Sequence, residues 1–246
     1  MTDSPHELDP ETGLPVGPRV PDPSPAPAPE RVTLQGRYSR LEPLSPERHG
    51  DTLFAISADP ELIPLYRYLY DDAMTDRTAF DTWLEQSSAS DNPLGFAVID
   101  EATGKTGGRV FLVSIEPAHR SIEVGNILFG PDIARTRVST EAIFLFLRYA
   151  FDDLGYRRFE WKCDSLNGPS RNAALRFGFV YEGLFRRHRI NSGRNRDTTW
   201  FAIIDEDWPQ VRQAFETWLA PENFDDAGRQ RQRLADLIAD AKSGAR

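Results

Sequence analysis

The segment from Trp161 to Gly183 constrains this chain more than any other part of its sequence. Its letters, WKCDSLNGPSRNAALRFGFVYEG, predict a strand ending at Cys163-Asp164, a polar loop, a short helix and a second strand. Helical spacing covers residues 171–177, and Gly178 lies where a helix C-cap glycine belongs. The loop from Ser165 to Ser170 brings an amide and a hydroxyl to a helix N-terminus. Such a unit can hold a polar ligand beside the end of a strand.

Composition then limits the class of protein. The chain has 246 residues, of which 39% are hydrophobic and 11% aromatic, and this supports a sizeable core. A net charge of -9 argues against bulk binding of nucleic acid. A single cysteine excludes an intrachain disulfide framework and a cysteine-rich zinc site, and we predict no metal.

The cellular location is inferred from what the sequence does not contain. No apolar run approaches the roughly 20 residues of a membrane span, so we predict no membrane partner. The first residues, MTDSPHELDPETG, are acidic and polar, unlike a secretory signal. We therefore expect a soluble cytoplasmic protein.

The sequence divides into three parts. Residues 1–33 form a proline-rich extended arm, because proline removes backbone donors and favours polyproline II. We expect the arm to be flexible or draped over the domain; a proline-rich ligand for a partner domain is the weaker alternative, since no basic residue flanks the prolines. Residues 34–209 form the main domain, and residues 210–246 a C-terminal helical extension.

Hydrophobic periodicity predicts alternating strands and helices in the main domain. Predicted strands span 37–44, 95–100, 109–115, 121–129, 158–163, 180–191 and 196–204, and predicted helices span 46–57, 60–70, 76–90, 139–154, 171–177, 208–219 and 225–241. Hairpins together with one βαβ step predict an α+β fold whose sheet is partly parallel at its centre. Gly125 lies inside a predicted strand, which suggests a β-bulge or a close backbone approach.

Three segments carry a resemblance to a known family. They are Gly130-Pro131 followed by Ser139-Thr140-Glu141-Ala142, then Asn167-x-x-Ser170 with Arg176-Phe177-Gly178-Phe179, and finally Glu182-Gly183 before a polar hairpin. In order and spacing they resemble the GNAT superfamily of acetyl-CoA-dependent N-acetyltransferases, over about Leu34 to Pro209. Within it the chain looks like the RimJ/RimL-type branch, which acetylates protein N-terminal amines. The resemblance implies a mixed, mostly antiparallel sheet with a central, splayed parallel strand pair and helices on both faces.

The resemblance also implies where acetyl-CoA binds. In the family, the strand matching 123–128 splays at a bulge, and its backbone binds pantetheine and the thioester oxygen; here these residues are Gly125, Asn126, Ile127 and Leu128. The loop before the central helix usually carries Gly-x-Gly and closes around the pyrophosphate. This chain has Arg135 and Arg137 at the two glycine positions, and the whole loop comprises Arg135, Thr136, Arg137, Val138, Ser139 and Thr140. The two guanidiniums either bond the phosphates in place of the glycines or form a solvated basic loop.

The segment after the fourth predicted helix supplies the thiol end of the site. Family analogy places Asn167 on the cofactor arm, although an asparagine before Gly-Pro is also a good helix N-cap. Many relatives use a tyrosine as general acid, but Ala174 occupies that position here. The RimL-type branch has a serine at the position of Ser170, which we take as the proton donor to the thiolate; the alternative is a hydroxyl that bonds the backbone.

The general base is harder to assign. The RimL-type glutamate falls near His188, which could serve as base or be a plain strand residue; Glu123 and Asp197 are further carboxylate candidates. An α-amine has a pKa of about 8, so an N-terminal substrate needs little help to lose its proton. The basic run 186–189, with Arg194 and Arg196, either attracts an acidic peptide or a phosphate, or is a solvated face.

The sequence thus predicts an enzyme that transfers acetyl from acetyl-CoA to a primary amine by direct attack in a ternary complex. The acceptor is a peptide N-terminus or a small amine, and a homodimer is a further possibility. The alternative is a non-catalytic acyl-CoA or peptide-binding module on the same fold, because the glycines, the tyrosine and a carboxylate base are missing from their usual positions.

Overall fold

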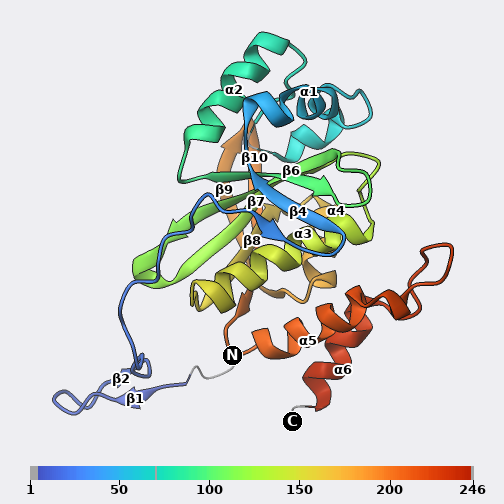
Figure 1. The fold of residues 1–246 in the computed structure, drawn as a ribbon. Coiled ribbons are helices and arrows are strands. Elements are labelled where there is room, and N and C mark those ends of the chain that lie inside the picture. The colour runs from blue at the N-terminus through green and yellow to red at the C-terminus, as the bar shows by residue number, and fades with distance from the viewer. Residues whose placement is uncertain (1–4, 70, 245–246) are drawn as a thin grey trace.

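An eight-stranded sheet forms the centre of the computed structural model, which describes residues 5–69 and 71–244 (Figure 1). The strand order is β3-β4-β5-β6-β7-β8-β10-β9, and every neighbouring pair is antiparallel except β7 and β8. The strands are β3 (Leu34–Gln35), β4 (Ser39–Pro43), β5 (Leu94–Asp100), β6 (Thr106–Glu116), β7 (Ser121–Phe129), β8 (Arg158–Asp164), β9 (Val180–Asn191) and β10 (Arg194–Ile204). The predicted α+β fold with one central parallel pair is confirmed.

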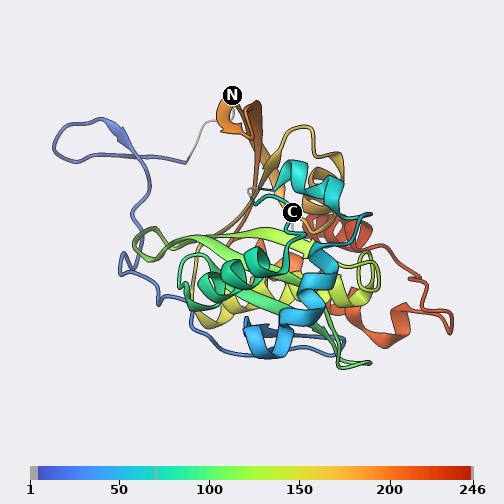
Figure 2. The ribbon, with the colours of Figure 1, turned by 90° about the horizontal axis from the view of Figure 1, so that it is seen from above.

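Helices cover both faces of this sheet (Figure 2). They are α1 (Pro46–Ser57), η1 (Ile63–Tyr68), α2 (Arg77–Ala89), η2 (Pro117–His119), α3 (Arg137–Arg148), η3 (Tyr149–Asp153), α4 (Gly168–Arg176), α5 (Trp208–Leu219), η4 (Pro221–Asn223) and α6 (Leu234–Gly244). α1 and α2 close a small apolar core against β5 and β6, around Phe80 and Phe111. α3, α5 and α6 share the larger core on the other face, where Phe144 stacks on Phe215 at 5.3 Å.

Several predicted ends are correct, and side-chain caps account for the starts of α1 and α2. The bounds of α1, β7, β9 and α5 coincide with the predicted ones. Asp76 accepts a hydrogen bond from the backbone of Ala79 and so starts α2. The helix predicted over 60–70 is a 3-10 helix that ends at Tyr68, and residue 70 lies outside the described residues.

The helix predicted over 225–241 is wrong in its first part. Residues 225–233 form a turn, and α6 begins only at Leu234. The Asp225 carboxylate accepts backbone hydrogen bonds from Ala227 and Arg229, and Gly228 has a φ of +73°. Aspartate that bonds its own following backbone favours a turn over a helix, which periodicity alone does not reveal.

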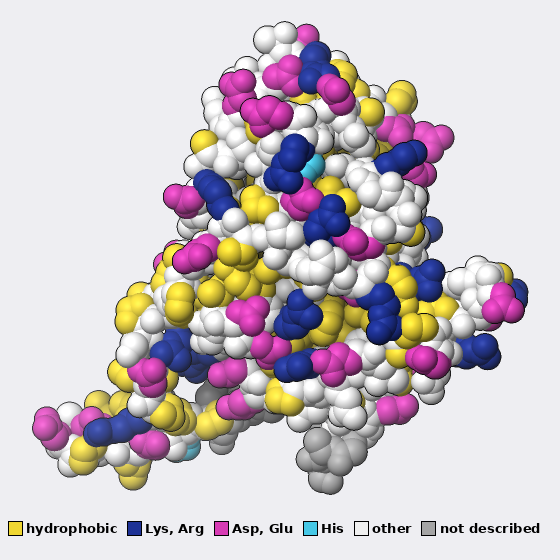
Figure 3. Space-filling model, in the orientation of Figure 1, with side chains coloured by type: hydrophobic (Ala, Val, Ile, Leu, Met, Phe, Trp, Pro, Cys, Tyr) yellow, Lys and Arg dark blue, Asp and Glu magenta, His cyan; other side chains and the backbone are white. Residues whose placement is uncertain are grey.

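In the described part of the proline-rich arm, the C-terminal half lies against the main domain, whereas the N-terminal half projects away from it. Arg120 donates to the Ser24 carbonyl, and Tyr149 accepts a hydrogen bond at its hydroxyl from the Glu30 backbone. The short strands β1 (Glu7–Leu8) and β2 (Pro15–Val16) form a hairpin away from the body of the molecule (Figure 1). Residues 1–4 of the predicted arm lie outside the described residues. Acidic and basic side chains are interspersed on the face drawn in Figure 3.

A buried carboxylate ties α3 to the edge of the sheet. Glu141 is 4% exposed and accepts backbone hydrogen bonds from Arg37 at 2.9 Å, Tyr38 at 2.6 Å and Ser39 at 2.6 Å. Hydrogen bonds to an ionised acceptor are stronger than neutral ones. Glu141 therefore fixes the turn between β3 and β4, and with it the start of the sheet, to the central helix.

We predict that Glu141→Ala lowers the free energy of unfolding by about 3 kcal/mol, because the buried N–H group of Ser39 and the partly buried N–H groups of Arg37 and Tyr38 lose a charged acceptor. Urea unfolding followed by circular dichroism measures this loss. Glu216→Ala on α5 is the matched control: Glu216 is half exposed and, among the described residues, forms an ion pair with Arg212 alone, so we expect a loss of less than about 1 kcal/mol. Similar losses in both variants would contradict the anchoring role.

Candidate active site

The parallel strands β7 and β8 pair over only part of their length. Their register runs from Ser121 opposite Arg158 to Val124 opposite Trp161, while β7 continues to Phe129. Beyond Val124, β7 keeps β6 as its only described strand partner. One side of the β7 backbone is therefore left without a described strand partner over residues 125–129, as the resemblance to the GNAT superfamily implied for this strand.

A β-bulge opens this gap at the predicted residues. Phe111 faces Gly125, but Arg109 faces Leu128, so β7 carries an extra residue. Asn126 has a φ of +45°, and a Cβ on Gly125 would lie 3.0 Å from the Val113 side chain. The prediction that Gly125 and Asn126 form a bulge is thus confirmed.

Two charged residues fix the position of the Asn126 side chain by hydrogen bonds. Its Oδ1 accepts a hydrogen bond from Arg109 at 3.2 Å, and its Nδ2 donates to Asp71 at 2.6 Å. Arg109 is fully buried, lies 4.3 Å from the Trp83 ring and also donates to Ser57. Burial lowers the pKa of the Arg109 guanidinium, and Tyr66 and Asp71 oppose that shift. Sequence reasoning missed both charged residues, although an arginine beginning the apolar run 109–115 was the available signal.

The loop before α3 keeps the backbone that glycine would favour. Arg135 has a φ of +63°, the left-handed region, at the position where the family carries its first glycine. Thr136 caps the helix, since its Oγ1 accepts a hydrogen bond from the Val138 backbone at 3.2 Å. The Arg137 guanidinium lies over Tyr38 at 4.6 Å and over Phe224 at 4.8 Å. The two arginines therefore differ: Arg137 has aromatic partners, whereas none of the described residues forms an ion pair with Arg135.

The first turn of α3 also meets α4. Ser139 and Thr140 are buried and both hydroxyls donate to the Thr136 carbonyl. Thr140 Oγ1 in turn accepts a hydrogen bond from Arg176 at 3.2 Å. Arg176, which was not predicted as a site residue, brings a third guanidinium close to this helix N-terminus, where anions are stabilised.

The thiol end of the predicted site is assembled around Trp161. Asn167 caps α4 by accepting a hydrogen bond from the Ser170 backbone at 3.1 Å. Ser170 Oγ accepts a hydrogen bond from Trp161 Nε1 at 3.0 Å, and this leaves the hydroxyl proton free to be donated. Trp161 is the last residue of β8 that pairs with β7, so Ser170 lies beside the point where the strands part. Ala174 is fully buried.

An ionised cluster lies on the opposite face of the same strands. Lys162 Nζ is 2.9 Å from Glu123 and 2.7 Å from Glu160, and Glu123 also accepts from Ser114 at 2.9 Å. Glu123 is 7% exposed. Burial raises the pKa of the Glu123 carboxyl, and Lys162 opposes that shift.

His188 lies farther along this face. Its ring centroid is 5.4 Å from Phe185 and 6.1 Å from Trp200, and Lys162 Nζ lies 4.1 Å over Trp200. Burial, followed by Arg189, lowers the pKa of His188, which favours its neutral form at pH 7. Ser170 and His188 thus lie on opposite sides of the sheet, and no described hydrogen bond joins them. Asp197 instead fixes the hairpin by accepting from the Arg187 backbone at 2.7 Å.

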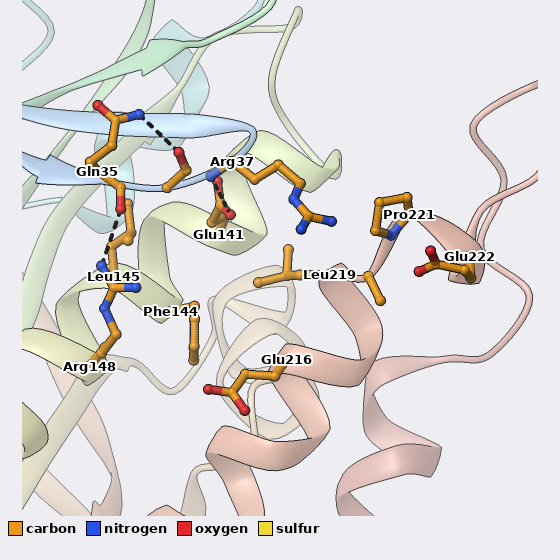
Figure 4. A pocket seen from close by; sticks show the side chains of 12 residues that line it. Gln35, Arg37, Glu141, Phe144, Leu145, Arg148, Glu216, Leu219, Pro221 and Glu222 are labelled. Atoms are coloured by element: carbon orange, nitrogen blue, oxygen red, sulfur yellow. Dashed lines mark hydrogen bonds between the residues drawn. The ribbon is translucent and has the colours of Figure 1, made fainter.

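A groove of about 550 Å³ lies elsewhere, between the β3–β4 turn, α3 and the end of α5 (Figure 4). In Figure 4, Glu141 points from α3 toward the turn, and its bond to Arg37 is dashed. None of the predicted site residues lines the groove, so it is separate from the splayed strands.

Within residues 5–69 and 71–244 there is no group of three or more histidine, cysteine or carboxylate side chains arranged to hold a metal ion. None of the described helices is long and apolar enough to cross a membrane.

A splayed parallel pair beside a helix N-terminus, in a mixed sheet, defines a class of protein: an acyltransferase that takes its acyl group from coenzyme A. Residues 40–180, more than half of the chain, match the family model described as Acetyltransferase (GNAT) domain. The chain belongs to the GNAT family of acetyltransferases.

Solved structures agree with this assignment. A GCN5-related N-acetyltransferase from Brucella melitensis is 51% identical, with a TM-score of 0.86, and the match covers 88% of this chain and 98% of that one. A probable GNAT-family acetyltransferase from Chromobacterium violaceum is 36% identical over 80% of this chain and 98% of that one, with a TM-score of 0.74. A structure described as an acetyltransferase from T. thermophilus is 28% identical over 75% and 95%, with a TM-score of 0.66. No curated protein matches the chain.

The family confirms part of what the sequence predicted. The chain is an N-acetyltransferase of the GNAT fold, and the family supports acetyl-CoA as acetyl donor in general. The RimJ/RimL-type branch, the acceptor amine, the site residues, a homodimer and a cytoplasmic location stay predictions.

We predict that Arg135→Gly weakens acetyl-CoA binding roughly fivefold to thirtyfold while leaving the fold intact. A charge-assisted bond to phosphate is lost, but glycine accepts the left-handed backbone that costs arginine about 1–2 kcal/mol. Isothermal titration calorimetry with acetyl-CoA, paired with thermal unfolding, measures both effects.

Arg120→Gly is the matched control, because Arg120 also has a positive φ, of +52°, and its side chain bonds Asp22 and the Ser24 carbonyl on the arm. We expect its acetyl-CoA affinity to equal that of the wild type. Wild-type affinity in Arg135→Gly would remove Arg135 from the phosphate site.

Proposed function

We propose that this enzyme transfers acetyl from acetyl-CoA to a primary amine, a protein N-terminal α-amine or a small amine, by direct attack in a ternary complex. The observation that carries the proposal is the loss of β7–β8 pairing after Val124 and Trp161 at the Asn126 bulge. The gap gives the two substrates access to one point from the two faces of the sheet. In its finer form, the proposal is that the enzyme is of the RimJ/RimL type and acetylates the N-terminal amine of a peptide.

Acetyl-CoA is proposed to lie on the α3 and α4 side. The phosphates would be held at the start of α3 by the backbone of residues 136–140 and by Arg135, with Arg176 nearby. The β8-facing backbone of Asn126, Ile127 and Leu128 would hold the pantetheine arm and polarise the thioester carbonyl. Asn167 caps α4 and faces the same region, so it is proposed to serve both as cap and as cofactor contact.

The amine is proposed to approach from the side of Glu123. Its attack on the thioester carbonyl breaks the C–S bond, and the leaving thiolate needs a proton. Ser170 is the proposed donor, because it lies at the parting of the strands and its hydroxyl proton is not used by Trp161. An α-amine needs little help to lose its own proton. Of the two carboxylates weighed as base, Glu123 lies on β7 two residues before Gly125, and Asp197 lies on β10. His188, on β9, is three strands away from β7.

We predict that Ser170→Ala lowers kcat by about a hundredfold or more and leaves the acetyl-CoA Kd within about twofold, because only the proton transfer is lost. Release of CoA thiol with a panel of N-terminal peptides, lysine peptides and polyamines gives the rates. Intersecting initial-rate plots would support direct transfer in a ternary complex, whereas a covalent acetyl-enzyme gives ping-pong kinetics.

Ser87→Ala, an α2 substitution away from the splayed strands, is the control for general damage. A wild-type rate in Ser170→Ala would show that another group protonates the thiolate. Tight acetyl-CoA binding without turnover of any amine would reject the proposed transfer and favour an acyl-CoA-binding role.

A further inference from the structure

The β9–β10 hairpin is basic within an acidic chain. Residues 180–204 carry a net charge of +3, whereas the whole chain carries -9. The arginines are Arg186, Arg187, Arg189, Arg194 and Arg196. Arg196 is buried, and the other four arginines are exposed. A concentration of one sign of charge on one element raises the local concentration of ligands of the opposite sign.

This hairpin borders the acceptor side of the splayed strands. Trp200 pairs with Lys162 across β10 and β8, and Lys162 also bonds Glu123 on β7. At the far end, Asn191 Nδ2 donates to the Leu69 carbonyl at 3.1 Å and joins β9 to the segment after η1. The basic surface is therefore continuous with the face from which the amine is proposed to approach.

Two ring nitrogens on this surface are buried and lack a hydrogen-bond partner among the described residues. They are His188 Nδ1 and Trp200 Nε1. A register shift between Arg196 and Thr198, with Arg187 at a φ of +53°, brings the His188 ring beside Trp200. Buried polar groups normally find partners, so unmet atoms at a binding surface point to a ligand. The indole N–H can only donate, and an anionic oxygen is the group that it would bond best.

The charged groups that shift the pKa of His188 are all cations. Burial lowers the pKa of His188 most, and the charged groups that lower it further are Arg189, Arg196 and Lys162. The carboxylates close by are already engaged: Glu123 and Glu160 bond Lys162, and Asp197 accepts from Arg187 and Asn195. An added carboxylate would thus meet an excess of positive charge.

We propose that the surface formed by Lys162, His188, Arg189 and Trp200 binds an acidic side chain of a peptide acceptor, so that the enzyme selects N-terminal amines followed closely by aspartate or glutamate. This inference rests on the proposed function, because it names the substrate class of the same site.

The spacing of the strands gives the position of the acidic residue. Neighbouring strands lie about 4.8 Å apart, so β10 and β9 are roughly 7 and 12 Å from the middle of the β7–β8 gap. An extended peptide advances about 3.3–3.6 Å per residue, which places the acidic side chain at about the third to fifth residue. Phe185, 50% exposed beside Trp200, offers the peptide an apolar contact that a small anion would not use.

The test compares kcat/KM for N-terminal hexapeptides that carry aspartate or asparagine at the third residue. We expect the aspartate peptide to be preferred at least about tenfold, since its carboxylate gains charge-assisted hydrogen bonds. Arg189→Gln should reduce this preference to about twofold. Arg19→Gln, which removes the same charge from the exposed arm, should keep the full preference.

Several results would overturn the inference. Equal kcat/KM for the two peptides would overturn it and leave the proposed acetyl transfer intact. A preference for aspartate that survives Arg189→Gln would have the same consequence. Faster turnover of free glutamate or phosphoethanolamine than of the aspartate peptide would reject a peptide as the source of the anion.

Absence of turnover with every peptide would count against the proposed function instead, and NMR titration of the His188 imidazole then decides the inference. A rise in the His188 pKa on adding the aspartate peptide, and not the asparagine peptide, supports it; an unchanged pKa overturns it.

Discussion

Backbone hydrogen bonding between β7 and β8 stops after Val124 and Trp161, and the rest of the site depends on that interruption. Two parallel strands at the centre of a sheet normally bond along their whole length, because buried backbone groups without partners are costly. Here an extra residue in β7 turns the strand away, and the left-handed Asn126 marks the point. The backbone groups that this leaves free are suited to a ligand that lies along the strand.

The interruption is supported by buried charge. Arg109 lies under the bulge and is bonded to Asn126 and Ser57, with Trp83 against its guanidinium. Asp71 bonds the other end of the Asn126 amide, so the segment between η1 and α2 is tied to β7 at its bulge. Because removing one partner of a buried charge is strongly unfavourable, this arrangement resists closure of the gap. The proposed donor side, with Ser170, and the proposed acceptor side, with Glu123 and Lys162, lie on opposite faces of the sheet.

Local signals in the sequence predicted the elements, and long-range contacts decided the rest. The helix over 46–57 and the strand over 121–129 were predicted to the residue because their caps and alternation are local. The turn at 225–233 was missed, since the Asp225 carboxylate bonds its own backbone and overrides the helical charge pattern. Arg109 and Asp71 were not predicted as site residues because their roles depend on partners far away in the chain. For Arg137, the family resemblance offered a phosphate-binding role as one option, but its stacking on Tyr38 and Phe224 is visible only in the fold.

Amide hydrogen exchange with and without acetyl-CoA tests the central claim, that the β7–β8 gap and the start of α3 hold the cofactor. Exchange of an amide slows when a ligand bonds or covers it. The account predicts slower exchange at residues 126–129 and 136–140 when acetyl-CoA is added, with little change in the groove at residues 35–37 and 219–222. Protection confined to that groove, or no protection on the β7 segment, would contradict it.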